Sequence, residues 1–322
     1  MAEHSTAPVA GHSVRPQEGR ATRWLDVTGI VILDKRSGVT SNRALQEVRR
    51  HFRARKAGHT GSLDPLATGV LPICLGEATK LSGMLLDSDK TYEVTARLGA
   101  STDTGDATGE VTGRADWSKV DADHLHDAHA QFLGQIEQVP PMYSAIKQDG
   151  QRLYKLAREG KSVERPPRTL QIHELELLGI DGPEFRSRVR CSKGTYIRTL
   201  VEDIAKSLGS LAHVTQLRRI AAGPFSIDQS VTIEQLRDSH QENTLETDGY
   251  ILNADAAVSG YPAIECDPDE THRILRGQRI CCDRATEIGV VRLYGPEGRF
   301  LGMGSVADPG VVMPKRLFRT DC

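Results

Sequence analysis

Residues 58–69 read Gly-His-Thr-Gly-Ser-Leu-Asp-Pro-Leu-Ala-Thr-Gly. The three glycines of this segment suit a tight, exposed loop, because glycine adopts backbone conformations that other residues avoid. Asp64 precedes a proline, and a lone Asp-Pro in such a loop is most often a turn initiator. The loop leads into an apolar run at 70–75, which has the length of a buried strand.

The residues before this loop predict a strand followed by a helix. Residues 29–34 form an apolar run of strand length, and the turn-prone sequence Lys-Arg-Ser-Gly follows at 35–38. Thr40 or Ser41 can cap the helix that comes next. This helix has an apolar stripe of Leu45, Val48 and Phe52 and a cationic outer face of Arg43, Arg49 and Arg50.

Helices and strands continue to alternate after the loop. A second amphipathic helix is expected through Ala78, Leu81 and Leu85. Residues 92–98 alternate between apolar and polar side chains, as in a half-buried strand, with Tyr92 on the apolar side. Two further elements are a strand at 185–191, with Arg186, Arg188 and Arg190 on one face, and a helix with Leu200, Ile204 and Leu208 on one stripe.

Two parts of the chain have a different character. The segment at about 139–168 is irregular and basic and begins and ends near Pro-Pro pairs, so we expect a projecting, partly mobile arm. Residues 256–322 contain only short strand candidates, at 289–294 and 300–303, divided by turn residues. The sequence therefore predicts an α+β fold, with a mixed sheet domain at 28–255 and a small β-rich domain at 256–322.

Charge is distributed unevenly along a chain that is nearly neutral overall. The 322 residues carry a formal charge of −2, so a polyanionic partner would have to be held by local clusters. Residues 35–56 contain eight basic residues against one acidic, and residues 147–168 contain seven against three. A charge run is more often a solvated face, but two runs flanking a glycine loop favour contacts with phosphates.

Several classes of protein are disfavoured by the composition. Six scattered cysteines, without a CxxC pair or zinc-ligand spacing, are typical of reduced thiols in the cytoplasm and predict no metal site. There is no run of 18 apolar residues and no secretory signal, so a membrane partner is not expected. Residues 1–27 lack a hydrophobic period, and we expect them to form a disordered leader.

The 58–69 loop is one of several segments that match a known family in the same order over about 29–225. The others are 29–35 (Gly-Ile-Val-Ile-Leu-Asp-Lys), 75–80 (Leu-Gly-Glu-Ala-Thr-Lys), 88–92 (Ser-Asp-Lys-Thr-Tyr), 99–106 (Gly-Ala-Ser-Thr-Asp-Thr-Gly-Asp), 139–147 (Val-Pro-Pro-Met-Tyr-Ser-Ala-Ile-Lys), 191–199 (Cys-Ser-Lys-Gly-Thr-Tyr-Ile-Arg-Thr) and 212–219 (Ala-His-Val-Thr-Gln-Leu-Arg-Arg). On these segments the chain resembles the bacterial TruB family of pseudouridine synthases.

This resemblance implies both a fold and an activity. It implies a catalytic domain on a mainly antiparallel sheet and a PUA-like C-terminal domain that binds RNA. It also implies that uridine 55, in the T loop of tRNA, is flipped out and isomerised to pseudouridine without metal or organic cofactor.

The resemblance further implies roles for single residues. Asp64 matches the family's catalytic aspartate, and a carboxylate can act as nucleophile while uracil leaves its sugar carbon and rejoins it through C5. Arg198 matches the arginine that pairs with this aspartate and would keep it ionised and oriented. Tyr92, Tyr196 and Leu217 match positions of the substrate pocket, although patterning alone places Tyr92 and Leu217 in the core.

Other matches concern RNA binding. His59 matches a histidine that fills the space left by the everted base, and without the resemblance it is an ordinary loop histidine. Lys35 matches a family lysine for which we expect structural support or a phosphate contact, and it is followed by Arg36 where the family usually has proline. The candidate contacts to the RNA backbone are Arg49, Arg50, Lys147, Arg152, Lys155 and Arg158.

Three functions compete for these residues. The principal hypothesis is a stand-alone, monomeric enzyme acting on tRNA, because the family's RNA-guided relatives lack the basic insertion at about 139–168. The main alternative is a non-catalytic RNA-binding or tRNA-folding protein on the same scaffold, which would have no need of Asp64. A glycoside hydrolase fits less well, because that chemistry uses two carboxylates and the loop offers one.

Overall fold

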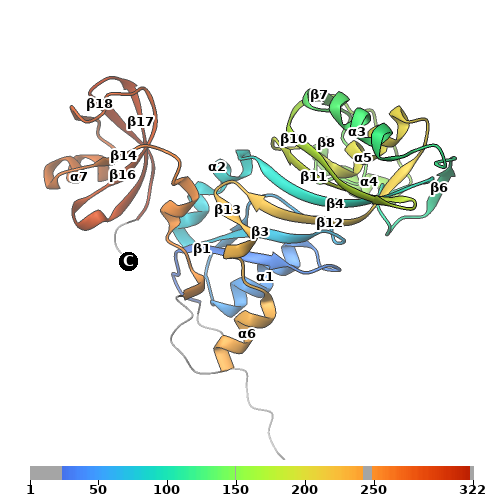
Figure 1. Cartoon of the computed structure of the whole chain (residues 1–322). Coiled ribbons are helices and arrows are strands. Elements are labelled where there is room, and N and C mark those ends of the chain that lie inside the picture. Colours follow the sequence, from blue (N-terminus) through green and yellow to red (C-terminus); the bar gives the residue numbers. More distant parts are fainter. Residues whose placement is uncertain (1–23, 149, 242–248, 320–322) are drawn as a thin grey trace, which may run out of the picture.

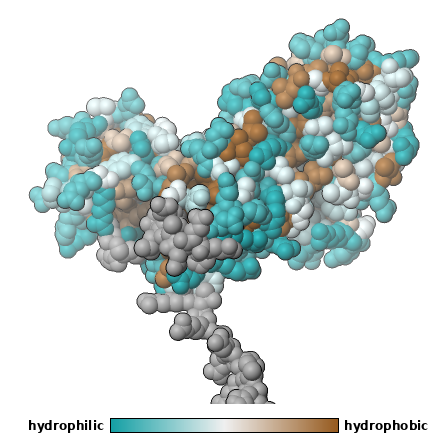
Figure 2. Space-filling view, turned by 60° about the horizontal axis from the view of Figure 1, so that its bottom comes forward, coloured by the Kyte–Doolittle hydropathy of each residue, from teal (hydrophilic) through white to brown (hydrophobic). Residues whose placement is uncertain are grey.

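The computed structural model describes residues 24–148, 150–241 and 249–319. These residues form a large body on a mixed sheet and a smaller β-rich body beside it (Figure 1 and, in space-filling view, Figure 2). The large sheet has the strand order β1-β3-β12-β4-β11-β10-β7, with β2 beside β3 and β13 beside β12. In that order the strands span Gly29–Lys35, Thr68–Leu75, Ala212–Ala222, Lys90–Leu98, Glu184–Cys191, Arg168–Asp181 and Gly134–Gln138, and the two short ones span Ala57–His59 and Phe225–Ser226.

The strand pairing confirms a mixed, mainly antiparallel sheet. Neighbouring strands run antiparallel except β3 and β12, which pair in parallel. Strand β1 reads as an unbroken apolar run because both of its faces are covered. Ile30 and Ile32 pack in one hydrophobic cluster, and Val31 and Leu33 pack in the other.

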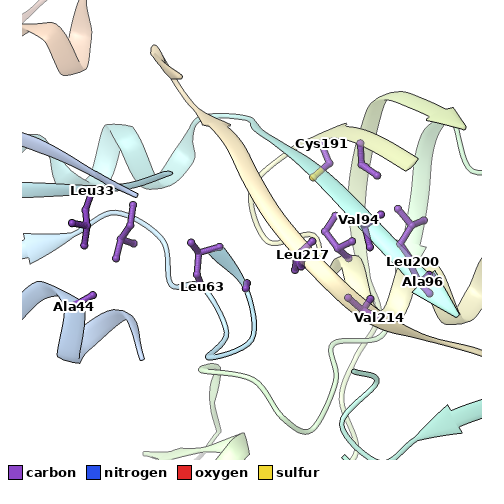
Figure 3. Packing of buried hydrophobic residues seen from close by; sticks show 14 of the residues in the cluster. Leu33, Ala44, Leu63, Val94, Ala96, Cys191, Leu200, Val214 and Leu217 are labelled. Atoms are coloured by element: carbon purple, nitrogen blue, oxygen red, sulfur yellow. The ribbon is translucent and has the colours of Figure 1, made fainter. Parts of the chain in front are cut away.

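Helices cover one face of the sheet along its length. Helices α1 (Ser41–His51) and α6 (Ile233–Gln241) lie at the β1 end, and α3 (Ala122–Gln131) and α5 (Ile197–Ser207) lie over β10, β4 and β12 (Figure 1). Their apolar side chains share one core with Val94 and Leu217 of the sheet (Figure 3). No helix in the described ranges is long and apolar enough to cross a membrane.

The opposite face of the sheet is covered at the β1 end and polar further along. The 3-10 helices η1 (Gly76–Leu81) and η4 (Ala254–Val258) and helix α2 (Ser82–Asp87) pack there. Along β4, Val94, Ala96 and Leu98 are buried while Glu93 and Thr95 point the other way, as the alternating sequence predicts. The predicted arginine face of β11 also faces that side, where Arg188 and Arg190 form ion pairs with acidic residues.

The C-terminal part is β-rich, as predicted, and has its own hydrophobic core. Its sheet order is β14-β16-β17-β18-β15, with strands at Ala263–Glu265, Gly289–Tyr294, Phe300–Asp308, Val311–Leu317 and Ile280–Cys281. Helix α7 (Pro268–Leu275) begins with a capping box between Asp267 and Glu270. Met303 packs into the hydrophobic cluster that Ile30 and Ile32 of the large sheet belong to, and so joins the two bodies.

The remaining elements are short. Strands β5 (Ala100–Thr102) and β6 (Val111–Arg114) form one hairpin, and β8 (Lys147–Gln148) and β9 (Gln151–Arg152) form another, which leads into helix α4 (Leu153–Arg158). The 3-10 turns η2 (Ile227–Gln229) and η5 (Pro296–Gly298) complete the described chain. The segment expected to be irregular therefore contains a hairpin and a helix, which Leu153 anchors with 1% of its surface exposed.

Three predictions of local structure need correction. The helix expected through Ala78 and Leu85 is divided into η1 and α2, although both side chains are buried as predicted. Of the predicted leader, residues 1–23 lie outside the described residues, but Leu25 is hydrogen bonded to Arg53 and Arg55 through backbone atoms. His59 is not in a loop, because it ends the short strand β2.

Candidate active site

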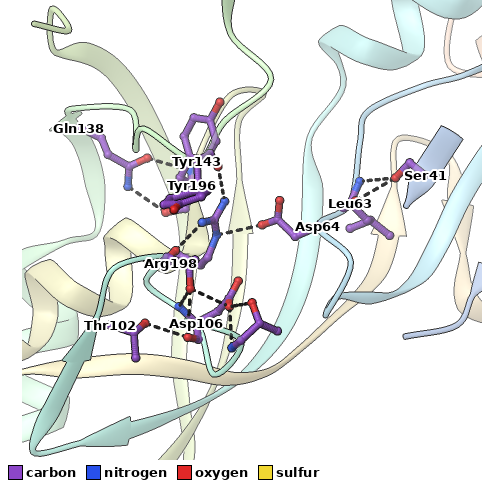
Figure 4. A network of polar contacts seen from close by, with 11 residues as sticks. Ser41, Leu63, Asp64, Thr102, Asp106, Gln138, Tyr143, Tyr196 and Arg198 are labelled. Carbon is purple, nitrogen blue, oxygen red and sulfur yellow. Dashed lines mark hydrogen bonds and ion pairs between the residues drawn. The ribbon is translucent and has the colours of Figure 1, made fainter. Parts of the chain in front are cut away.

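The loop that carries Asp64 is held from beneath by polar contacts on both sides of that residue. Thr40 caps α1, so Ser41 is the first helical residue, and its hydroxyl accepts from the Leu63 amide at 2.8 Å and donates to the Leu63 carbonyl at 2.9 Å (Figure 4). On the other side, the Lys35 ammonium donates to the Pro65 carbonyl at 3.4 Å. These two anchors fix the backbone that presents the Asp64 carboxylate.

Lys35 is a structural residue in this fold. Its side chain is fully buried, and its ammonium also donates to the carbonyls of Val39 at 2.8 Å and Arg36 at 3.0 Å. Burial lowers the pKa of Lys35 to about 8, with the nearby Asp64 charge acting in the opposite direction. Of the two roles expected for this lysine, a phosphate contact does not fit, because the ammonium is enclosed by protein carbonyls.

Asp64 forms an ion pair with Arg198, as the resemblance implied. The Arg198 Nε lies 2.9 Å from the Asp64 Oδ2, and the other guanidinium nitrogens donate to the carbonyls of Thr104 at 2.5 Å and Tyr143 at 2.9 Å (Figure 4). The exposed fraction is 5% for the Arg198 side chain and 40% for the Asp64 side chain. The arginine is therefore fixed by the protein, while the carboxylate can be reached from outside.

The electrostatics of the pair differ from a simple salt bridge. Partial burial raises the pKa of Asp64, and this effect exceeds the opposing attraction of Arg198. The nearby Asp106 carboxylate raises the pKa of Asp64 further. Arg198 thus favours the ionised form, as expected, but it does not bring the Asp64 pKa down to its usual value.

Both predicted tyrosines lie near this carboxylate. Burial raises the pKa of Tyr92 and of Tyr196, and the Asp64 charge contributes to both shifts. Tyr196 comes immediately before α5, two residues before Arg198. Leu217 is 8% exposed and pairs with Val94 across β12 and β4, close in register to Tyr92 (Figure 3). The predicted core setting of Tyr92 and Leu217 is thus combined with a position beside the candidate site.

His59 ends strand β2 just before this loop and lies opposite Ile73 of β3. Burial lowers the pKa of His59, and the charges of Arg219 and Arg152 lower it further, so the imidazole is neutral at pH 7. Its Nδ1 is buried without a hydrogen-bond partner among the described residues. The segment at 139–168 lies close to the loop, because its Tyr143 carbonyl accepts from Arg198, the partner of Asp64.

Four of the predicted RNA-backbone residues are exposed on that segment, namely Lys147, Arg152, Lys155 and Arg158. The two candidate residues of α1 differ in exposure. Arg50 is exposed, but Arg49 is half-buried, donates to the carbonyls of Ala54 and Arg55, and lies over the Trp24 ring at 4.6 Å. Arg49 therefore supports the turn after α1, and its contact with RNA stays a prediction.

Arg219 is a site residue that the sequence did not single out. Its side chain is 1% exposed and donates to the carbonyls of Val70 at 2.7 Å and Gly61 at 3.1 Å. Gly69 has φ of +99°, and a Cβ there would lie 2.2 Å from the Arg219 carbonyl oxygen. The close approach of β3 to β12 thus requires glycine at this position. An arginine in a strand is normally expected to point into solvent, so no signal in the sequence indicated that Arg219 is buried.

A cavity of about 450 Å³ lies against the sheet and borders the candidate site, because Leu66 of the Asp64 loop and Leu217 both line it. Its lining includes Glu93, Thr95, Arg186 and Arg218, and Arg218 is held by Asp34 at 2.7 Å. Among the described residues, no group of three or more His, Cys, Asp or Glu side chains is arranged to hold a metal ion.

Comparison with known proteins gives consistent matches along the chain. Residues 49–197 match the family described as TruB family pseudouridylate synthase (N terminal domain), residues 198–259 match the tRNA pseudouridylate synthase B C-terminal domain, and residues 262–318 match Pseudouridine synthase II TruB, C-terminal. Proteins named tRNA pseudouridine synthase B from Stutzerimonas stutzeri and Pseudomonas syringae are each 50% identical over 297 residues. Each alignment covers 92% of this chain and 97% of the relative.

Solved structures share the architecture at lower identity. One is titled "Crystal Structure of a Cbf5-Nop10-Gar1 Complex" and matches with a TM-score of 0.67 and 25% identity, covering 88% of this chain and 79% of that chain. Another is titled "Structure of H/ACA RNP bound to a substrate RNA containing 2'-deoxyuridine" and matches with a TM-score of 0.70 and 22% identity, covering 91% and 86%. The second likeness shows the fold alone.

Proposed function

The chain belongs to the TruB family of pseudouridine synthases, and we propose that it converts uridine 55 in the T loop of tRNA into pseudouridine. In this isomerisation the bond between N1 and C1′ breaks, the uracil rotates, and C5 bonds to C1′. The proton on C5 leaves and N1 gains one, so no outside reactant is consumed. The protein has to supply a nucleophile or a stabilising anion, a pocket for the rotating base, and a grip on the RNA.

The ion pair between Asp64 and Arg198 is the observation that carries this proposal. A carboxylate at this place can hold a covalent intermediate or stabilise a cationic sugar while the base turns. Arg198 orients it through Oδ2 at 2.9 Å, and its own position is fixed by two backbone carbonyls. An RNA-binding protein without catalysis would need neither the carboxylate nor this support, so the non-catalytic alternative has no observation in its favour.

The neighbouring side chains suit an everted base. Tyr92, Tyr196 and Leu217 supply aromatic and apolar surface beside Asp64, on which a flipped uracil can stack and turn. His59 is neutral and has an unpartnered ring nitrogen, so it can fill the gap in the RNA without adding a charge. Removing a base from its stack costs a few kcal/mol, which such a wedge offsets in part.

Two parts of the chain are proposed to hold the tRNA. Residues 28–255 form the catalytic part, and within it the exposed cations of the segment at 139–168 contact the T-arm backbone. Residues 256–322 form a PUA-like RNA-binding part. We expect the enzyme to work as a monomer in the cytoplasm, without guide RNA, metal or organic cofactor. The basic segment supports this expectation, because it provides a grip on RNA from the chain itself.

The direct test is to treat an unmodified tRNA transcript with the purified protein, without guide RNA or added metal, and to map pseudouridine at single-nucleotide resolution. We expect one modified position, uridine 55. A transcript in which that uridine is replaced by cytidine serves as the control and should remain unmodified. Pseudouridine at other positions, or none at all, would contradict the proposed substrate.

A further inference from the structure

Gln138 occupies the root of the basic segment. It is the last residue of β7, and its backbone pairs with Arg168, the first residue of β10. The chain between these two residues, 139–167, therefore leaves the sheet and returns to it at one point. We call this segment the arm. Although Gln138 is a polar residue, 2% of its surface is exposed. A buried amide at this junction needs partners for both its donor and its acceptor.

Both partners are provided by the backbone of Tyr196. The Tyr196 amide donates to the Gln138 Oε1 at 2.8 Å, and the Gln138 Nε2 donates to the Tyr196 carbonyl at 3.1 Å (Figure 4). The same carbonyl accepts the first hydrogen bond of α5, from the Leu200 amide at 3.0 Å. Tyr196 makes no side-chain capping bond for this helix. The side chain of Gln138 therefore fixes the beginning of α5 much as a neighbouring strand would.

Arg198 lies two residues further along, in the first turn of this helix. The arm reaches the same arginine a second time, because the Tyr143 carbonyl accepts from the Arg198 guanidinium at 2.9 Å. Ser144, the next residue, is buried and its carbonyl accepts from the Tyr154 amide at 3.1 Å, which ties this part of the arm to α4. A continuous set of contacts thus connects the arm, the start of α5, Arg198 and Asp64.

From these contacts, and resting on the proposed function, we propose that Gln138 is a positioning residue for the reaction. It sets the root of the arm against the start of α5 and so holds Arg198 at the distance and angle that orient the Asp64 carboxylate. It touches no reacting atom. The role requires one donor and one acceptor at the end of a long, buried side chain, a combination that glutamine provides and that alanine or an ionised carboxylate does not.

The test compares Gln138→Ala and Gln138→Glu with Gln135→Ala, a control at an exposed glutamine of the same strand. For each variant we would measure thermal melting, the Kd for a tRNA transcript, and the single-turnover rate of pseudouridine formation with saturating enzyme. We expect Gln135→Ala to match the wild type. We expect Gln138→Ala to lower the single-turnover rate by roughly 10- to 100-fold, as misplacement of a catalytic group by about 1 Å does, with a nearly unchanged Kd.

Gln138→Glu adds a readout that loss of stability would not give. Burial raises the pKa of the introduced carboxyl, and once protonated it again offers one donor and one acceptor. The ratio of the Gln138→Glu rate to the wild-type rate should therefore rise as the pH falls. Two results would overturn the inference. One is an equal single-turnover rate for Gln138→Ala and Gln135→Ala, and the other is weaker tRNA binding by Gln138→Ala with an unchanged rate. A wild-type protein that forms no pseudouridine would instead contradict the proposed function, and the inference with it.

Discussion

Basic residues lie both in the strands around the Asp64 loop and on the arm, but the two sets have different partners. Beneath the loop, Lys35 and Arg219 are buried and donate to backbone carbonyls, so they stabilise the protein's own backbone. On the arm, Arg152 and Lys155 are exposed and available to a partner. One region is built to keep a carboxylate still, and the other to present charge to RNA.

This difference shows that counting charges along the sequence gives too simple a picture. Both basic runs were interpreted as surfaces for phosphates, and in the first run Lys35 and Arg49 are occupied by backbone carbonyls instead. A cation whose hydrogen-bonding capacity is met by carbonyls inside the fold has little left for RNA. The two regions should therefore respond differently to substitution: rate and stability should depend on the loop, and affinity on the arm.

The largest expected effect is that of Asp64→Asn. Removing the carboxylate should lower turnover by on the order of 10⁴-fold or more, as the loss of a covalent nucleophile does in other enzymes. The Kd for tRNA should hardly change, because the arm is intact. Single-turnover kinetics and a filter-binding titration on the same preparation measure both. Pseudouridine formed at the wild-type rate would exclude Asp64 from the mechanism.

Glycine substitutions compare the rigidity of the two regions directly. In Gly69→Ala the new Cβ would meet the Arg219 carbonyl oxygen at 2.2 Å, and φ is +99°, so we expect a loss of unfolding free energy of about 3–5 kcal/mol. Gly160 of the arm has φ of +70°, but a Cβ added there would meet no atom within 4 Å, so Gly160→Ala should cost only about 1–2 kcal/mol. Denaturant unfolding measures both, and equal losses would contradict the contrast.

Much of the large sheet could be predicted because its strands carry local patterns. The unbroken apolar run of β1 and the alternation of β4 depend on which faces are covered, and both signals survive in the sequence. Strand β2 was missed because three residues, Ala57–His59, are too few to show a period. The parallel pairing of β3 with β12 joins residues about 150 positions apart, so only the folded chain shows it.

The candidate site was predicted in its chemistry but not in its support. Asp64, Arg198 and the tyrosines were identified from the family resemblance, and the structure brings them together. The supporting groups Arg219 and Gln138 were missed, because their partners are backbone carbonyls and amides. Every residue type offers those atoms, so a sequence gives no sign of which side chain will use them.

Neutralising the cations of the arm should change the affinity for tRNA but not the rate of the reaction. In the triple substitution of Arg152, Lys155 and Arg158 by glutamine, each lost phosphate contact should reduce the slope of log Kd against log salt by roughly 0.7 to 0.9. The single-turnover rate at saturating enzyme should stay within a few-fold of wild type. Substituting Arg114 and Lys119, exposed cations outside the arm, is the matched control. An unchanged slope in the triple variant would show that the arm does not contact the RNA backbone.

The smallest expected effect is one of pH, and it sharpens the same contrast. Because burial raises the pKa of Asp64, the ionised carboxylate is present above that raised value and is lost as the pH falls through it. The acid limb of the single-turnover rate should therefore lie above the ordinary aspartate range, while the Kd stays flat because the lysines and arginines of the arm remain charged. In Arg198→Gln the limb should move to higher pH, since the guanidinium favours the ionised form. A limb that moves the other way, or a Kd that follows it, would mean that the titrating group belongs to the RNA grip and not to the loop.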